Sequence, residues 1–424
     1  MNTLRGNAVV AQSGGPTAVI NSSACGVIQE ALKNKDSIAG VYGANNGILG
    51  ILHEDLFDVA AESAAVIDDL KRTPSSAVGS CRYKLGDLTK DREKYERLLD
   101  VFKAQNIRYF FYIGGNDSMD TADKVNRLAH EQGYELRVMG VPKTIDNDLV
   151  VTDHCPGYGS VAKYLATSVM EAGRDTEAMY TFDPVTVTEA MGRNTGWIAA
   201  ACGLASRTED EAPNLIYVPE IPFSIERFLD DVRDAHRRLG RCFVVVSEGV
   251  KNEKGEYVSA QAEVDSFGHR QLGGVADYLR QLITRETGLK ARYNKLDTCQ
   301  RNAIHFASRT DSDEAYLCGQ EAVRQALAGT TGKMVTLKRE SDRPYRCGTG
   351  LTALAEVANG VKHLPRAYMN VAGTGISDAM RTYVGPLVMG EVAVRVGSDG
   401  LPVFARLQRR PIAKKLPPFV GKKQ

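Results

Sequence analysis

The most constraining feature of the sequence is a regular alternation of short runs rich in β-branched and aromatic residues with longer stretches of helical spacing. The runs that predict strands are Asn7–Gln12, Ile38–Gly43, Arg108–Ile113, Arg137–Val141, Asn214–Val218 and Cys242–Ser247. The stretches with helical spacing are Gly15–Lys33, Asp91–Gln105, Met119–Gln132, Tyr158–Ala172 and Ile225–Leu239. Most of the strands are apolar on both faces, which is typical of parallel strands covered by helices. The pattern predicts a doubly wound α/β fold with ligands at the carboxyl ends of the strands.

Length and charge narrow the class of protein. A chain of 424 residues exceeds what one small core requires, so we expect two lobes. The 53 basic and 52 acidic residues leave a net charge of +1, which indicates neither nucleic acid nor a membrane surface as partner. Residues Met1–Ala8 lack the apolar core of a secretion signal, and no later run approaches a membrane span. We therefore expect a cytoplasmic protein.

The cysteines and the C-terminus give two further expectations. Eight cysteines stand singly without a CxxC pair, so neither a zinc site nor a disulfide framework is expected. The basic, proline-containing residues Lys414–Gln424 are expected to form a flexible tail.

Three loops that follow predicted strands carry the chemistry. After the first strand comes SGGP at residues 13–16, whose glycines let backbone N–H groups approach a phosphate, although such a turn alone is typical of any tight turn. The third strand ends in GGNDS at residues 114–118, at the start of another predicted helix. The fourth leads to PKTIDND at residues 142–148, which groups a lysine with two carboxylates. Such a grouping favours phosphoryl transfer, where a metal ion, a cation and a base converge on one group.

Together with two later motifs, these loops resemble the phosphofructokinase family. The five motifs, in the order typical of that family, are SGGP, GGNDS, PKTIDND, MGR at 191–193 and SEG at 247–249. The resemblance extends from about residue 7 to beyond residue 301. It implies two Rossmann-like three-layer α/β/α lobes with the active site in the cleft between them. The implied donor-binding lobe covers residues 1–150 and about 303–360, and the sugar-phosphate lobe covers 151–302 and about 361–413.

The resemblance also implies a reaction and residue roles. The reaction is Mg²⁺-dependent phosphorylation of the 1-hydroxyl of fructose 6-phosphate, a reversible step of glycolysis and gluconeogenesis. The implied catalytic residues are Asp146 as proton acceptor, Thr144, Lys143 and Arg82. The implied donor site comprises Gly14, Gly15, Gly115, Asn116, Asp117, Ser118 and Lys143, and Asn116, Ser118 and Asp148 are the implied metal side. The implied sugar site comprises Thr144, Asp146, Asp148, Met191, Gly192, Arg193, Glu248, Arg292 and Arg301. In the family the position of Arg292 acts across a subunit interface, which implies a homodimer or homotetramer.

Three positions depart from the family pattern. Pro184 stands where an arginine is usual, and Thr298 stands where an aromatic residue or a histidine is usual. Fewer phosphate ligands are therefore accounted for, so sedoheptulose 7-phosphate stays open as an alternative acceptor. Asn116 replaces a carboxylate found in many members, which removes one charge from the metal side.

The phosphoryl donor is predicted from two residues. ATP-using members usually carry glycine at the position of Asp117, whose carboxylate here would meet the α-phosphate of a nucleotide. Lys143 is suited to pair with the more compact pyrophosphate. We therefore predict pyrophosphate as donor, with an ATP-dependent phosphofructokinase as the alternative.

Two other classes of function remain as alternatives. One is a non-catalytic regulatory chain of the same fold, against which the intact TIDND at residues 144–148 argues. The other is a nucleotide-linked dehydrogenase, which is disfavoured because the first loop lacks GxGxxG and no acidic ribose ligand follows it.

Overall fold

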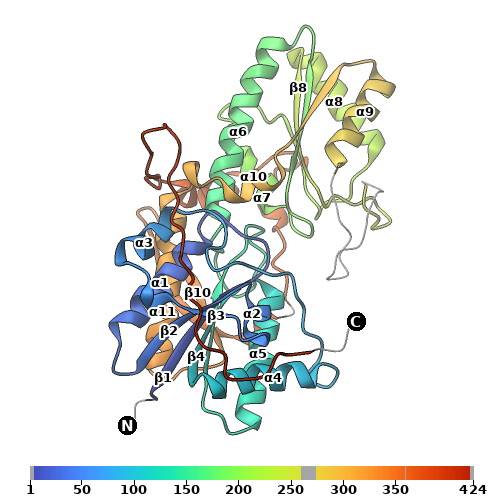
Figure 1. Ribbon diagram of the computed structural model, residues 1–424. Coiled ribbons are helices and arrows are strands. Elements are labelled where there is room, and N and C mark those ends of the chain that lie inside the picture. Colours follow the sequence, from blue (N-terminus) through green and yellow to red (C-terminus); the bar gives the residue numbers. More distant parts are fainter. Residues whose placement is uncertain (1–3, 259–273, 359, 421–424) are drawn as a thin grey trace.

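The apolar strands assemble into two separate sheets, one in each lobe of a computed structural model that describes residues 4–258, 274–358 and 360–420 (Figure 1). The larger sheet has the strand order β11-β10-β5-β4-β1-β2-β3. Its strands are β1 (Gly6–Gln12), β2 (Ile38–Ala44), β3 (Leu56–Asp58), β4 (Ile107–Gly114), β5 (Arg137–Pro142), β10 (Lys333–Asp342) and β11 (Tyr345–Ala353). The inner strands are parallel, whereas β3 and β11 pair antiparallel at the two edges.

The smaller sheet has the order β7-β8-β6-β9, and all of its strand pairs are parallel. Its strands are β6 (Val185–Ala190), β7 (Leu215–Tyr217), β8 (Cys242–Ser247) and β9 (Ala291–Lys295). β9 forms one edge of this sheet, and the side chains of Arg292 and Tyr293 on it are exposed.

Helices cover both faces of each sheet. On the larger sheet, α1 (Ile20–Lys33) and α11 (Arg309–Leu327) pack on one face, and α4 (Arg92–Ala104) and α5 (Asn116–Glu131) pack on the other. On the smaller sheet, α6 (Tyr158–Met179) and α7 (Trp197–Ala201) lie opposite α8 (Ile225–Leu239) and α9 (Val275–Thr287). The short helices are α2 (Ile48–Leu52), α3 (Ala64–Asp69), α10 (Asp297–Asn302), α12 (Leu354–Val357) and α13 (Asp378–Val384).

The predicted fold class is confirmed. Two helices, α1 and α6, differ from their predicted bounds. α1 begins at Ile20 instead of Gly15, because residues 13–16 are occupied by the glycine turn. α6 continues to Met179, seven residues beyond the predicted end at Ala172. No helix in the described part of the chain is long and apolar enough to cross a membrane.

The C-terminal segment lies on the larger sheet's lobe, which differs from the sequence prediction. The sequence predicts that residues up to 413 belong to the second lobe and that residues 414–424 form a flexible tail. Ile412 N–H donates to the Leu56 carbonyl at 3.0 Å, and the N–H groups of Lys415 and Leu416 donate to the Glu54 carboxylate. Figure 1 shows this segment in dark red, crossing the lower lobe beside β3 before the C-terminus. Backbone hydrogen bonds therefore fix the chain to the first lobe as far as Leu416, and residues 421–424 lie outside the described part.

Candidate active site

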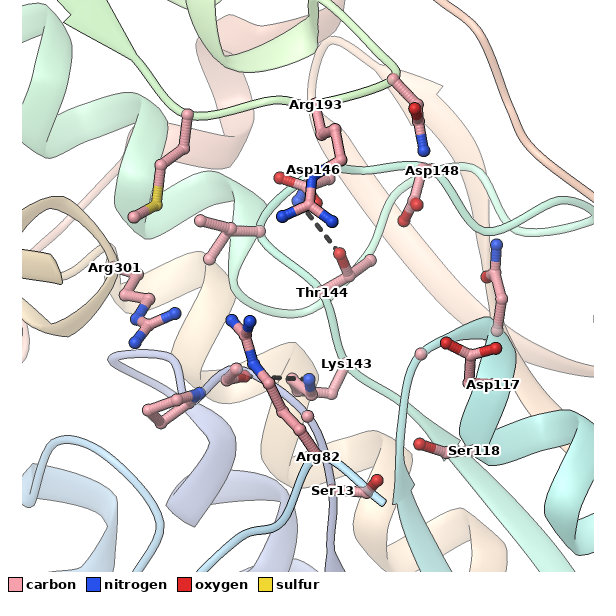
Figure 2. A pocket seen from close by; sticks show the side chains of 18 of the residues that line it. Ser13, Arg82, Asp117, Ser118, Lys143, Thr144, Asp146, Asp148, Arg193 and Arg301 are labelled. Carbon is pink, nitrogen blue, oxygen red and sulfur yellow. Dashed lines mark hydrogen bonds between the residues drawn. The ribbon is translucent and has the colours of Figure 1, made fainter. Parts of the chain in front are cut away.

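A cleft of about 830 Å³ lies between the two sheets, where the carboxyl ends of their parallel strands meet. Figure 2 shows side chains from both lobes around it. The predicted site residues that line it are Gly14, Gly15, Arg82, Gly115, Asn116, Asp117, Ser118, Lys143, Thr144, Asp146, Asp148, Met191, Arg193, Glu248 and Arg301. Gly192 and Arg292 do not line it. A doubly wound fold places ligands at this end of its strands, so the cleft is the candidate active site.

The glycine turn after β1 brings two cations together. Gly14 has a φ of 77°, and a Cβ there would lie 3.0 Å from Lys143 Nζ. A Cβ on Gly15 would lie 3.0 Å from Arg301 Nη1. Lys143 Nζ donates to the Gly15 carbonyl at 2.9 Å (Figure 2). Glycine suits this turn because Gly14 has a left-handed φ and a side chain at either position would crowd the two cations.

The GGNDS motif forms the N-terminus of α5. A Cβ on Gly114 would lie 2.1 Å from Ser118 Oγ, so the turn closes tightly onto the first turn of the helix. Asn116 Nδ2 donates to the Gly360 carbonyl at 2.8 Å, whereas its buried Oδ1 has no hydrogen-bond partner. Asp117 pairs with Lys84 at 2.8 Å. Backbone N–H groups and the positive end of the helix dipole thus point toward the cleft, an arrangement that suits an anion.

Internal hydrogen bonds hold the PKTIDND loop in place. Asp146 N–H donates to Thr144 Oγ1 at 3.0 Å, and Thr195 Oγ1 donates to the Asp146 carbonyl at 3.0 Å. Asn147 is fully buried with a φ of 55°, and its Nδ2 donates to the Tyr383 hydroxyl at 2.9 Å. Because Asn147 is anchored in this way, the carboxylates on either side of it face the cleft, as Figure 2 shows for Asp146 and Asp148.

Burial shifts the pKa values of the groups in this loop toward neutrality. It lowers the pKa of Lys143 to about 8, against the opposing attraction of Asp146 and Asp148. Burial and the charge of Asp148 raise the pKa of Asp146 to about 7. The pKa of Asp148 is also raised by burial. Perturbed acids and bases that share one cleft are typical of catalytic sites.

The second lobe contributes the MGR and SEG loops, which pack closely against each other and share a hydrogen bond. Ser247 Oγ donates to the Gly192 carbonyl at 2.7 Å, and a Cβ on Gly249 would lie 1.9 Å from the Arg193 carbonyl. Gly192 thus shapes the loop with its backbone, while Arg193 and Glu248 reach the cleft. Burial and the charge of Glu189 raise the pKa of Glu248 to about 7.

The two predicted phosphate arginines lie in different surroundings. Arg301 lines the cleft, and its buried Nε has no hydrogen-bond partner. Arg292 lies on the edge strand β9 with 54% of its side chain exposed, and it pairs with Asp183 of its own chain. This chain alone therefore brings Arg301, but not Arg292, to the site.

The cleft also contains residues that the motifs did not predict. Among them are Tyr83, Glu189, Lys295 and Gln300. Glu189 accepts hydrogen bonds from Gly274 N–H at 3.0 Å and Ala276 N–H at 3.1 Å, and so fixes the start of α9. A carboxylate inside an otherwise apolar and threonine-containing strand was the signal available for Glu189. Lys295 carried no comparable signal.

A second cluster with metal-ligand chemistry lies outside the cleft. His154, Glu314 and Cys347 have ligand atoms within 4.8 Å of one another. Both ring nitrogens of His154 already contact carboxylates, Asp153 at 2.7 Å and Glu314 at 2.6 Å. These contacts identify the cluster as a buried charge network that joins α11 to the segment after the PKTIDND loop.

Comparison with known proteins agrees with the fold and the cleft. The profile of the phosphofructokinase family matches residues 7–326. The chain is 49% identical to a pyrophosphate–fructose 6-phosphate 1-phosphotransferase of Xanthomonas campestris pv. campestris, over 98% of this chain and 99% of that protein. A relative of the same name from Halomonas elongata is 48% identical over 97% of this chain and 99% of its own. The crystal structure of a pyrophosphate-dependent phosphofructokinase from Marinobacter aquaeolei superposes with a TM-score of 0.90 at 46% identity, covering 98% of this chain and all of that one. The chain belongs to the phosphofructokinase family.

Proposed function

We propose that this protein transfers a phosphoryl group from pyrophosphate to the 1-hydroxyl of fructose 6-phosphate, giving fructose 1,6-bisphosphate and phosphate. The observation that carries the proposal is the PKTIDND loop, whose buried lysine and two carboxylates face the glycine turn in one cleft. Full-length relatives named for this activity support it. The reaction is reversible, and we assign the enzyme to the cytoplasm.

The donor end of the cleft is proposed to lie in the first lobe. Gly14 shapes the turn, and its N–H donates to the Cys81 carbonyl at 3.1 Å. Gly15 and Gly115 place no side chain between their backbone and the donor phosphates, and the dipole of α5 adds positive potential there. Lys143 and Arg82 supply the cations, and a guanidinium can bridge two phosphate oxygens at once. Asp117 lines this end of the cleft, where its carboxylate would repel and obstruct the α-phosphate of a nucleotide, so the proposed donor is pyrophosphate.

Asp146 is proposed as the general base. The hydroxyl oxygen attacks the nearer phosphorus of pyrophosphate as Asp146 accepts the hydroxyl proton. The bond from that phosphorus to the bridging oxygen breaks, and its electron pair stays on the bridging oxygen, which departs with the phosphate. The raised pKa of Asp146 suits this role because a base that titrates near neutrality can both accept and release the proton. Thr144 holds the loop and the sugar beside it.

The residues at the start of α5 fit a magnesium ion. Asn116 offers a buried oxygen without a hydrogen-bond partner, and Ser118 and Asp148 add a hydroxyl and a carboxylate at the same cleft. Hard oxygen donors of this kind are what Mg²⁺ prefers, and the ion would neutralise the charge of the donor phosphates.

The sugar end is proposed to lie in the second lobe. Met191, Arg193 and Glu248 are proposed to contact the sugar and Arg301 its 6-phosphate, while Gly192 shapes the loop. Arg292 is proposed to complete the 6-phosphate site of a neighbouring subunit, since it lies on an exposed edge strand away from its own cleft. The enzyme is then a homo-oligomer.

A coupled assay of fructose 1,6-bisphosphate formation tests the proposal. With Mg²⁺ and fructose 6-phosphate, we expect turnover with pyrophosphate and little with ATP. Sedoheptulose 7-phosphate as acceptor measures how selective the sugar site is. Asp146→Asn should lower kcat by about 10²- to 10⁴-fold with little change in sugar affinity. Preference for ATP identifies the ATP-dependent alternative, and absence of turnover with every donor identifies a regulatory chain.

A further inference from the structure

An ion pair between Lys84 and Asp117 lies at the edge of the cleft beside the proposed donor end. Lys84 Nζ lies 2.8 Å from Asp117 Oδ1, and their side chains are 46% and 42% exposed. The hydrogen bond with Asp117 raises the pKa of Lys84, so the lysine stays charged beside it. Asp117 lines the cleft, whereas Lys84 is not among the lining residues and is partly exposed.

The loop that carries Lys84 is fixed at the two residues that follow the lysine. Leu85 is fully buried in the core beneath α4 and α5. The Gly86 carbonyl accepts from the Tyr95 hydroxyl at 3.0 Å, and Gly86 N–H donates to the Asp91 carboxylate at 2.6 Å. The lysine is therefore held at a set position against the first turn of α5, and its flexible side chain has only a short distance to span.

Without Lys84, the negative charge of Asp117 would oppose the binding of the negatively charged donor. Pyrophosphate carries several negative charges, and a lone carboxylate at Asp117 would repel it at the N-terminus of α5. The next acidic residue on that face, Asp120, is already paired with Lys124 at 2.6 Å. Lys84 is the partner that compensates Asp117. The pair keeps the bulk of the carboxylate at the end of the site while cancelling most of its repulsion.

We propose that Lys84 is a positioning residue for donor selection, acting through Asp117. By holding the carboxylate across the end of the donor site, it admits a donor of two phosphates and excludes any chain that continues beyond the second phosphate. This inference rests on the proposed use of pyrophosphate. It predicts discrimination by the length of the phosphate chain, independent of any contact with a nucleoside.

The first test is a double-mutant cycle on pyrophosphate kinetics. Lys84→Met keeps the bulk of the side chain and removes its charge, and it should raise KM for pyrophosphate about tenfold, with KM for fructose 6-phosphate unchanged. Lys84→Arg should stay near the parent. In an Asp117→Asn background, Lys84→Met should have almost no effect, because no carboxylate remains to be compensated. Lys90→Met, on the same loop, is the control and should behave as the parent.

The second test uses inorganic tripolyphosphate, which extends the donor without adding a nucleoside. The parent should discriminate strongly for pyrophosphate, and Lys84→Ala combined with Asp117→Gly should reduce the ratio of kcat/KM for the two donors by about tenfold or more. An equal effect of Lys84→Met in both backgrounds, or parental KM in that variant, would overturn the inference while the parent still used pyrophosphate. Failure of the parent itself to use pyrophosphate would instead reject the proposed function.

Discussion

At the scale of single residues, the cleft depends on groups whose charge is set by burial. Lys143 is 5% exposed and faces the glycine turn, so its charge is costly to keep and its pKa is lowered. Asp146 experiences the opposite shift for the same reason. The two shifts bring an acid and a base to within about one pH unit of neutrality on the same short loop.

The pH dependence of catalysis follows from these two groups. The proposed base must be deprotonated, so kcat/KM should rise with pH through about 7, the raised pKa of Asp146. Lys143 must stay charged, so kcat/KM should fall as pH rises through about 8. Lys143→Arg should remove the alkaline fall, because arginine keeps its charge. An alkaline limb that is the same in that variant would show that Lys143 does not cause it.

Mixing two variant chains tests whether the arginines of the proposed 6-phosphate site, Arg301 and Arg292, act in the same subunit or in neighbouring ones. Arg301→Ala and Arg292→Ala should each raise KM for fructose 6-phosphate more than they lower kcat, because both are proposed to contact a group remote from the reacting centre. Co-expression of the two variant chains should regenerate sites with parental KM, because one of the two sites in a hybrid pair would hold both arginines. If Arg292 served its own chain, every site in the hybrid would lack one arginine and none would recover.

The motif residues could be predicted from sequence because their spacing is tied to strand ends, and each of the five motifs places at least one residue in the lining of the cleft. Glu189 and Lys295 could not be predicted in this way. Each owes its place to the pairing of β6 with β9, a contact between strands far apart along the chain.

At the scale of elements, sequence patterning succeeded where strands are apolar and failed where buried polar residues interrupt the pattern. β6 reads VTVTEA, yet all six residues are buried. Its threonines find partners there, since the hydroxyl of Thr186 lies 2.8 Å from that of Thr176. α11 was missed for a similar reason: Asp311 is buried on its inner face and accepts from Gly157 N–H and Ser160 N–H, each at 2.9 Å.

The contact between α1 and α11 yields a stability prediction. A Cβ on Gly319 would lie 2.1 Å from the Ser23 carbonyl of α1, so the two helices approach closely at this glycine. Gly319→Ala should lower the free energy of unfolding by about 1–3 kcal/mol, measured by chemical denaturation. Asp313→Ala, at a side chain that is 65% exposed on the same helix, should change it by less than about 0.5 kcal/mol. Equal stability of the two variants would contradict the close approach.

At the scale of the whole molecule, the lobes are assembled from separated parts of the chain. The larger sheet takes β10 and β11 from beyond residue 330, after the chain has passed through the second lobe. The remaining division of residues into a donor lobe and a sugar-phosphate lobe stays a functional prediction, which the donor and arginine experiments test.

The C-terminal segment should stabilise the first lobe. Asp58 N–H donates to the Arg410 carbonyl at 3.0 Å, and Ile412 N–H donates to Leu56, so the segment covers the edge strand β3. A chain that ends at Phe404 should unfold at a lower temperature and aggregate more readily, because that edge becomes available for pairing. A chain that ends at Val420 is the control and should melt as the full chain does. Equal melting temperatures would mean that the segment adds no stability.

The discontinuous sheet has a consequence for how the protein is made. While the ribosome is still adding the second lobe, β1, β2, β4 and β5 have already emerged, but β5 has no neighbour on its outer side and β3 is uncovered. The N-terminal half therefore has two unpaired sheet edges, at β5 and at β3, until β10 and the C-terminal segment have been synthesised. Translation pauses in that interval should increase aggregation of the newborn chain, whereas pauses after the C-terminal segment has docked should have no such effect.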